Sequence, residues 1–164
     1  MNKYIILCID DEREVLDSVT EDLEPLKGFF DIEAAESARE ARDIVDDVIA
    51  DERMVALVLC DHIMPGTHGV DFLISLNQNE KTTNTIKILL TGLADQEDTI
   101  KAVNEANLDH YIAKPWDGQE LYATVVDHLT SYIIDNEEDM VPYAKILDGP
   151  RIFQAIHDKG LMTL

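Results

Sequence analysis

Three aspartates stand where apolar runs of the chain end, which is the position at which α/β proteins bind ligands. Asp61 follows the apolar run 54–60 and opens a loop with proline and glycine, while Asp10 and Asp11 end the run 4–9. One such aspartate alone is more typical of a turn or a helix cap. Three in corresponding positions favour a site for a hard cation such as Mg²⁺, beside a carboxylate that could act as a nucleophile.

Two later apolar runs end in residues of complementary chemistry. Thr91 ends the fourth run and could donate a hydrogen bond to an oxyanion, and Lys114 follows the fifth run as a point charge suited to phosphate. Pro115 is a candidate for a cis peptide bond, the minority state of prolines. Tyr111 is expected to point outward, which is ordinary for an amphipathic side chain.

Composition limits the classes of protein. The 164 residues suffice for one domain with a modest extension, and a net charge of −21 disfavours nucleic-acid phosphates as partners. Cys8 and Cys60 lie inside apolar runs and are expected to be small buried hydrophobic residues. The N-terminus runs directly into a predicted strand, and no apolar stretch reaches the ~18 residues of a membrane span. We therefore expect a soluble, cytoplasmic protein without membrane contact.

Strand-like and helix-like patterns alternate five times along the chain. Short β-branched runs predict strands, apolar residues at helical spacing predict helices, and Ser37 with Glu40 and Asp117 with Glu120 form capping boxes. The predicted strands are 3–9, 29–34, 54–60, 86–90 and 111–113, and the predicted helices are 12–23, 37–51, 69–77, 95–107 and 118–134. Such alternation implies parallel strands, right-handed crossovers and helices on both faces of the sheet.

The tail, 135–164, departs from this pattern. It opens with an acidic turn, 135–139, that is expected to be solvated. Apolar residues then recur at helical spacing and predict two short amphipathic helices, whose apolar faces need a cover. These residues are Met140, Tyr143, Ala144 and Leu147, then Ile152, Phe153 and Ile156. The tail could cap the domain, mediate formation of a homodimer or begin an output domain, but it is too short and acidic to read DNA.

Taken together, these motifs resemble the receiver domain of two-component response regulators. The resemblance covers 3 to about 132, and it is specific because of the order and common placement of its motifs. It implies a flavodoxin-like (βα)5 fold with a five-stranded parallel sheet of order 2-1-3-4-5. The receiver domain would span 1–134, and 135–164 would be a helical extension or a linker to an output domain. The residues that carry the resemblance are Asp10, Asp11, Asp61, Met64, Pro65, Gly69, Thr91, Gly92, Tyr111, Lys114 and Pro115.

The resemblance further implies that Asp61 accepts a phosphoryl group from a histidine kinase or a phosphotransfer protein. Asp11, Asp61 and the backbone carbonyl of His62 would bind Mg²⁺ directly, and Asp10 through water, with Mn²⁺ able to substitute. The chain would not be an enzyme in the usual sense. It would undergo only Mg²⁺-dependent self-phosphorylation from a phosphohistidine donor and slow self-dephosphorylation.

The implied switch begins with charge. Lys114 would pair with the phosphoryl oxygens, Thr91 would move to donate to them, and Tyr111 would turn into the space that Thr91 leaves. The surface of the fourth helix, fifth strand and fifth helix would then change and control a partner or an output domain. Three histidines are not spaced like a set of metal ligands and are expected at the surface or in loops, namely His62, His68 and His110.

Two other functions are weaker readings of the same residues. A phosphatase of the haloacid dehalogenase type needs a second aspartate two residues after the nucleophile, where this chain has Ile63. A flavodoxin-like flavin binder needs a phosphate-binding loop after the first strand, where Asp10 and Asp11 would repel phosphate.

Overall fold

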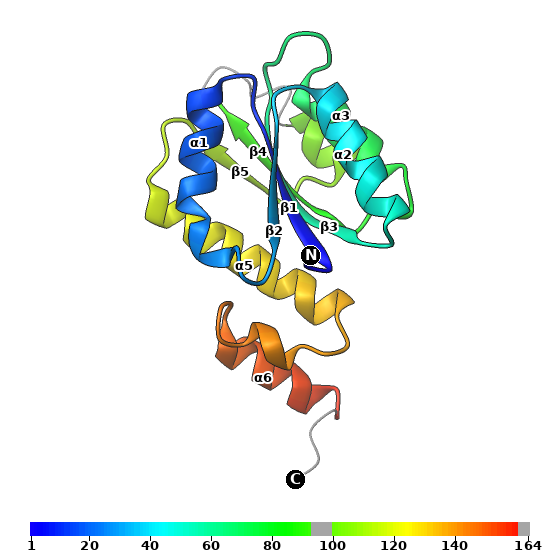
Figure 1. The fold of residues 1–164 in the computed structure, drawn as a ribbon, viewed down its shortest axis with the longest axis vertical. Helices are drawn as coiled ribbons and strands as arrows, with labels where there is room; N and C mark the ends of the chain where they lie inside the picture. Colours follow the sequence, from blue (N-terminus) through cyan, green and yellow to red (C-terminus); the bar gives the residue numbers. More distant parts are fainter. Residues whose placement is uncertain (93–99, 161–164) are drawn as a thin grey trace.

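The computed structural model describes residues 1–92 and 100–160. In this part of the chain, five parallel strands form one sheet of order β2-β1-β3-β4-β5, which confirms the predicted topology (Figure 1). The strands are β1 (Tyr4–Ile9), β2 (Asp31–Ala35), β3 (Met54–Asp61), β4 (Ile86–Thr91) and β5 (His110–Ala113). The helices are α1 (Arg13–Asp22), α2 (Ala38–Ala50), α3 (Gly69–Asn77), α5 (Gly118–Asn136) and α6 (Gly149–Asp158), with 3₁₀ turns η1 (Glu24–Leu26) and η3 (Val141–Tyr143) and a π turn η2 (Ala102–Ala106).

Helices cover both faces of the sheet, and the residues of β1 alternate between them. Tyr4, Ile6 and Cys8 belong to the core that α1 and α5 complete, whereas Ile5 and Leu7 belong to the core on the side of α2 and α3. Every residue of β1 is buried, as is typical of a central strand in a parallel sheet. Both cysteines are free and buried, as expected.

Two helices begin at the predicted caps. Ser37 Oγ accepts the backbone N–H of Glu40 at 3.1 Å. Asp117 Oδ1 accepts the N–H groups of Gln119 and Glu120 at 2.8 and 3.2 Å. Since α5 follows β5 directly, the cap at Asp117 fixes where the chain turns away from the carboxyl edge of the sheet.

Most predicted boundaries differ from the observed ones by one or two residues. The second strand begins at Asp31 rather than at 29, because the carbonyl of Leu26 accepts the N–H groups of Phe29 and Phe30, both at 3.0 Å, and holds them in a turn. The predicted helix 95–107 falls partly on residues outside the described ranges. Within the described residues, this segment contains the short π-helix η2.

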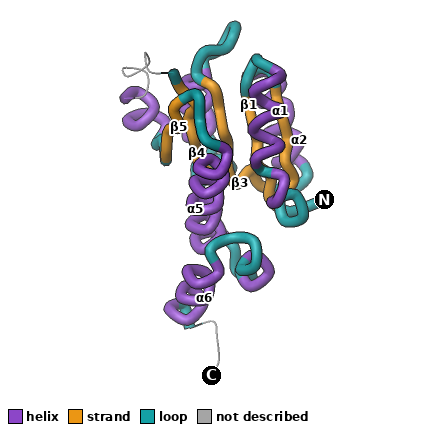
Figure 2. The backbone as a smooth tube through the Cα atoms, turned by 90° about the vertical axis from the view of Figure 1, so that its left-hand side faces the viewer, coloured by secondary structure: helices purple, strands orange, loops and turns teal. Residues whose placement is uncertain are grey.

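The tail folds differently from the two helices predicted for it. Only the second is an α-helix, α6, while Met140 to Leu147 contains the short 3₁₀ turn η3. The N–H groups of Tyr143, Ala144 and Ile146 each donate to a carbonyl three residues earlier, which is the 3₁₀ pattern rather than the α-helical one. Asp148 then caps α6 by accepting the N–H of Arg151 at 3.3 Å. Met140, Leu147 and residues of α6 join the core on the side of α1 and α5. Figure 2 shows α6 packed beside the end of α5, beyond the sheet.

The expectation that the acidic turn is solvated is wrong for Glu137. Its side chain is only 10% exposed, and it accepts hydrogen bonds from the Tyr4 hydroxyl at 2.5 Å and from Lys3 Nζ at 3.0 Å. The Tyr4 ring also contacts Tyr132 and Tyr143, with centroids 5.5 and 6.1 Å apart. The tail therefore lies against the amino ends of the strands. Among the described residues, no helix combines the length and apolarity needed to cross a membrane.

Candidate functional site

The three predicted aspartates meet at the carboxyl edge of the sheet. Strands β1 and β3 are neighbours with Ile9 opposite Cys60, so the residues that follow, Asp10 and Asp61, come side by side. Carboxylate oxygens of Asp10, Asp11 and Asp61 lie within 4.8 Å of one another. Asp10 and Asp61 are buried and Asp11 is exposed. This set of oxygen donors at a solvent-accessible mouth fits a hard divalent cation.

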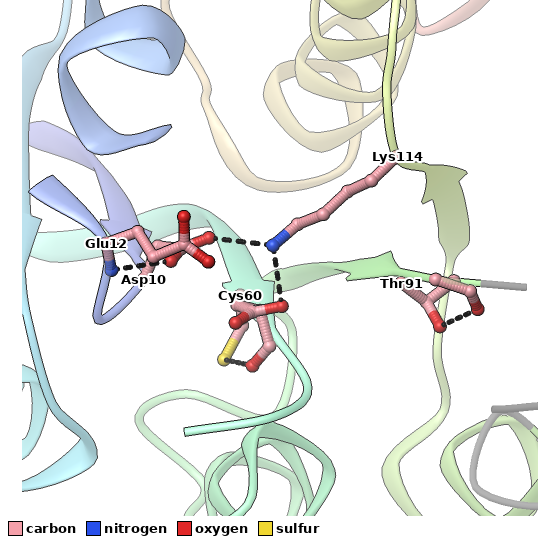
Figure 3. A network of polar contacts seen from close by, with 7 residues as sticks. Asp10, Glu12, Cys60, Thr91 and Lys114 are labelled. Carbon is pink, nitrogen blue, oxygen red and sulfur yellow. Dashed lines mark hydrogen bonds and ion pairs between the residues drawn. The ribbon is translucent and has the colours of Figure 1, made fainter. Parts of the chain in front are cut away.

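Lys114 completes the cluster from the end of β5. Its Nζ lies 3.0 Å from Asp10 Oδ2 and 2.9 Å from Asp61 Oδ1 (Figure 3). Burial alone lowers the pKa of Lys114, but its hydrogen bonds to Asp61 and Asp10 outweigh that effect, so its pKa is raised. The ammonium group therefore stays charged between the two carboxylates.

The pKa of the Asp61 carboxyl is raised. Burial is the largest cause, the hydrogen bond from Lys114 opposes it, and the charges of Asp10 and Asp11 add to it. Three carboxylates against one ammonium leave the cluster with an excess of negative charge. The site can therefore gain from a bound cation, which would stabilise the ionised form of Asp61.

A backbone N–H group holds the Asp10 carboxylate in place, and this contact was not predicted from the sequence. Asp10 Oδ1 accepts the N–H of Glu12 at 2.9 Å, as in an Asx-turn. An aspartate two residues before the N-cap of a helix, here Glu12, is a signal that could have found it. The carbonyl of His62 accepts the N–H of Gly69 at 2.9 Å. A backbone carbonyl oxygen is one of the ligand types that a hard cation binds.

Gly69 has a steric reason to be glycine. A Cβ at this position would lie 2.0 Å from the backbone oxygen of Asp61 and 2.9 Å from Cys60 Sγ. No side chain fits so close an approach to backbone. The start of α3 is thereby packed directly onto the residue at the end of β3.

His62 corrects one expectation. Its side chain is 4% exposed rather than at the surface. The N–H of His62 donates to the carbonyl of Leu90 at 3.3 Å, which extends the pairing of β3 with β4 by one residue and turns the imidazole inward. Its ring centroid lies 5.2 Å from that of His68.

The fold and this cluster can be compared with known proteins. Residues 6–126 match the family model described as the response regulator receiver domain. The chain belongs to this family. Phosphorylation on an aspartate is the general function of receiver domains, and the chain is accordingly the receiver of a two-component response regulator.

Relatives and solved structures agree with this assignment. The receiver domain is 35% identical over 120 residues to the hydrogenase transcriptional regulatory protein HoxA of Cupriavidus necator, covering 73% of this chain and 23% of HoxA. It is 34% identical over 125 residues to the transcriptional regulatory protein CpxR of Escherichia coli K12, covering 76% of this chain and 48% of CpxR. The chain thus spans about a quarter and about half of the lengths of these relatives.

Among solved structures, the signal receiver domain of an HD domain-containing protein from Pseudomonas fluorescens Pf-5 has a TM-score of 0.72 at 28% identity, covering 84% of this chain and 95% of that one. A CheY-like receiver from Methanospirillum hungatei JF-1 has a TM-score of 0.70 at 26% identity, covering 83% and 100%. These receivers share the flavodoxin-like fold of this chain.

The remaining predicted residues lie on β4, on β5 and directly after β5. Thr91 ends β4, is buried, and its hydroxyl donates to the carbonyl of Gly92 at 3.0 Å. Tyr111 is 56% exposed, so its side chain points outward as expected. The Lys114–Pro115 peptide bond is cis.

A groove of about 430 Å³ leads to Lys114 between α1 and the segment after β5. Its apolar wall contains Val15, Pro115 and Trp116, and its rim contains Glu12 and Ser18. Trp116, the single tryptophan of the chain, donates from Nε1 to Asp22 Oδ2 at 3.1 Å and so fixes the wall to the end of α1.

Proposed function

We propose that Asp61 is the phosphoacceptor of this receiver. The observation that carries the proposal is the ion pair between Lys114 Nζ and Asp61 Oδ1, at 2.9 Å, inside the cluster of three aspartates. Asp10 is engaged on both oxygens, by Glu12 and by Lys114. Asp61 ends the central strand β3, between β1 and β4, and Lys114 from the end of β5 supplies its counter-charge.

The proposed reaction transfers a phosphoryl group from a histidine nitrogen to the carboxylate of Asp61. A carboxylate oxygen of Asp61 attacks the phosphorus of a phosphohistidine on a histidine kinase or phosphotransfer protein. The P–N bond breaks, its electron pair stays on the imidazole, and an acyl phosphate forms on Asp61. Because an anion attacks a dianion, the positive charge of Lys114 offsets the repulsion and stabilises the charge on the phosphoryl oxygens.

The cluster fits Mg²⁺, which favours few carboxylates together with waters and phosphate oxygens. Asp11, Asp61 and the carbonyl of His62 would hold it directly, and Asp10 through water. When bound, the ion neutralises charge on the transferring phosphoryl group. Mn²⁺ is also suited to carboxylate and carbonyl ligands and can substitute.

The readout begins at Thr91 and ends at Tyr111. The phosphoryl oxygens are strong acceptors, so the Thr91 hydroxyl leaves Gly92 and donates to them. Tyr111 then turns inward, and the surface of the fourth helix, β5 and α5 changes. That surface controls a protein partner or an output domain in the cytoplasm. A net charge of −21 disfavours direct binding of nucleic acid by this chain.

The tail, 135–164, belongs in this proposal as a cap on the receiver domain, 1–134. Support comes from Ile152 and Ile156, which are 0% and 4% exposed in the core shared with α5, and from the bonds of Glu137 to Tyr4 and Lys3. A tail that caps the receiver can also connect it to an output domain. The alternative role for the tail is to form the contact of a homodimer.

The deciding experiment is labelling of the full chain by acetyl phosphate with Mg²⁺, followed by intact mass. The wild-type chain should gain one phosphoryl group, and Asp61→Asn should gain none. Asp71→Asn is a matched control, since Asp71 lies in the first turn of α3 and pairs with Lys101 at 3.5 Å. Chelation of the metal should also prevent labelling. Undiminished labelling of Asp61→Asn on another residue would show that the assignment is wrong.

A further inference from the structure

Two histidines outside the acidic cluster face each other across two elements. His110 begins β5 and His128 lies in α5, and their ring centroids are 5.4 Å apart with an angle of 48° between the ring planes. They are far apart in sequence and share no helix, so the fold brings them together. The proposed phosphoryl chemistry uses neither imidazole.

The separation of the rings is that of a chelating pair. A zinc–nitrogen bond is about 2.0–2.1 Å, so two imidazoles on one tetrahedral ion have ring centroids roughly 5 Å apart. The observed centroid distance of 5.4 Å is close to that value. We propose that His110 and His128 form a binding site for a divalent transition-metal ion of the zinc class, with water completing the coordination.

The surroundings of the pair favour a neutral His110 imidazole and leave it accessible to an ion from solvent. Burial lowers the pKa of His110, the neighbouring His128 lowers it further, and Asp127 opposes both. A neutral imidazole has the lone pair that a metal needs. His110 is exposed and His128 is half-buried, so an ion can reach the pair from solvent.

Asp127 supports the site through its charge rather than as a ligand. Its Oδ1 pairs with Arg151 Nη1 of α6 at 2.6 Å, which holds the carboxylate on the side of the tail. Among the described residues, the acidic cluster is the one group of three or more carboxylate, imidazole or thiol ligands close enough to share an ion. The histidine pair is therefore a site with two protein ligands and open positions.

Ligand chemistry separates this site from the acidic cluster. Imidazole suits zinc, copper and nickel, whereas carboxylates and carbonyls suit magnesium and manganese. Excess Mg²⁺ should therefore occupy the cluster of Asp10, Asp11 and Asp61 and leave the histidine pair open. Both imidazoles lie on the surface that the proposed function expects to change, but the site itself does not depend on phosphorylation.

The test is a titration of the full, unphosphorylated chain with Zn²⁺ in excess Mg²⁺, following the imidazole resonances of all five histidines by NMR. The resonances of His110 and His128 should shift together and saturate at one ion per chain. Loss of a partner that only orients a ligand weakens metal binding roughly 10–100-fold, so His110→Asn and His128→Asn should each weaken it by at least tenfold. His157→Asn is the matched control because His157 is exposed on α6, and it should bind Zn²⁺ as the wild type does.

Two results would overturn the proposal. Zn²⁺ could shift only the resonances of His62 and His68, or its affinity could be unchanged in His128→Asn with circular dichroism showing a folded chain. Asp61→Asn separates this proposal from the proposed function, because it should abolish labelling and keep Zn²⁺ binding. Retained Zn²⁺ binding together with retained labelling would contradict the phosphoacceptor alone.

Discussion

The ammonium nitrogen of Lys114 lies 2.9 Å from Oδ1 of Asp61, and the same nitrogen lies 3.0 Å from Asp10. One cation thus bridges carboxylates at the ends of two adjacent strands, β1 and β3. Asp10 is 1% exposed and has the least access to solvent screening. The bridge therefore has two consequences, since it pairs buried carboxylates with a counter-charge and places positive charge where a phosphoryl group would arrive.

Replacing Lys114 tests the second consequence. We expect Lys114→Gln to slow labelling by acetyl phosphate on the order of 10²–10³-fold, the usual effect of losing one electrostatic donor aimed at the transition state. The rate is followed by intact mass at saturating Mg²⁺. Lys101→Gln removes an exposed lysine paired with Asp71 and should keep the wild-type rate. Equal rates for the two variants would remove Lys114 from the proposed chemistry.

The close approach at Gly69 gives a prediction about stability. In Gly69→Ala the new Cβ would lie 2.0 Å from the oxygen of Asp61, so the start of α3 must move. Such overpacking typically lowers the free energy of unfolding by about 1–3 kcal/mol. Urea denaturation measures the loss. Gly28→Ala is the control, because nothing lies within 4 Å of a Cβ there, and a similar loss in both variants would refute the steric explanation.

The fold was predictable because its signals are local. Apolar runs, capping residues and helical spacing fix the alternation of elements, and parallel strands bring their carboxyl ends to one edge. Asp10, Asp61 and Lys114 could therefore be expected at one edge of the sheet, while the strand order that makes them neighbours was implied by the resemblance to receiver domains. The second strand was predicted two residues early because Phe29 and Phe30 are as apolar as strand residues, while the turn that holds them depends on Leu26.

Features that depend on tertiary contact could not be predicted. In the sequence, Glu137 is one of several acidic residues in a segment that is expected to be solvated. Its hydrogen bonds to Tyr4 and Lys3 form only when the tail packs against the start of β1. The pairing of His110 with His128 needs the packing of α5 beside β5. The inward turn of His62 depends on its bond to Leu90, which no spacing in the sequence encodes.

Two adjacent residues of α6 test whether the tail is part of the domain core. Ile152 is fully buried, whereas Phe153 is 47% exposed. We expect Ile152→Ala to lower the free energy of unfolding by about 2–5 kcal/mol, as for other large-to-small changes in a core, and Phe153→Ala to have little effect. Urea denaturation of the full chain measures both. Equal, small effects would mean that the tail is not packed as a cap.

Glu137 should make the docking of the tail depend on pH. Burial raises the pKa of Glu137, but the hydrogen bonds from Tyr4, Lys3 and the N–H of Asp139 outweigh it, so the pKa is lowered. A carboxyl whose pKa is lower in the folded chain stabilises the fold above its unfolded value of about 4.5. That stabilisation is lost as pH falls through the lowered value.

Glu137→Gln should therefore be less stable than the wild type at neutral pH, by roughly 1.5–3 kcal/mol for hydrogen bonds to a charged group. The difference should shrink as pH falls below the unfolded value, because the wild-type carboxyl then becomes neutral as well. Urea denaturation at neutral and acidic pH measures the difference. Glu138→Gln is the matched control, since Glu138 is exposed and should change little at either pH. A deficit for Glu137→Gln that stays constant with pH would mean that packing of the side chain, not its charge, ties the tail to β1.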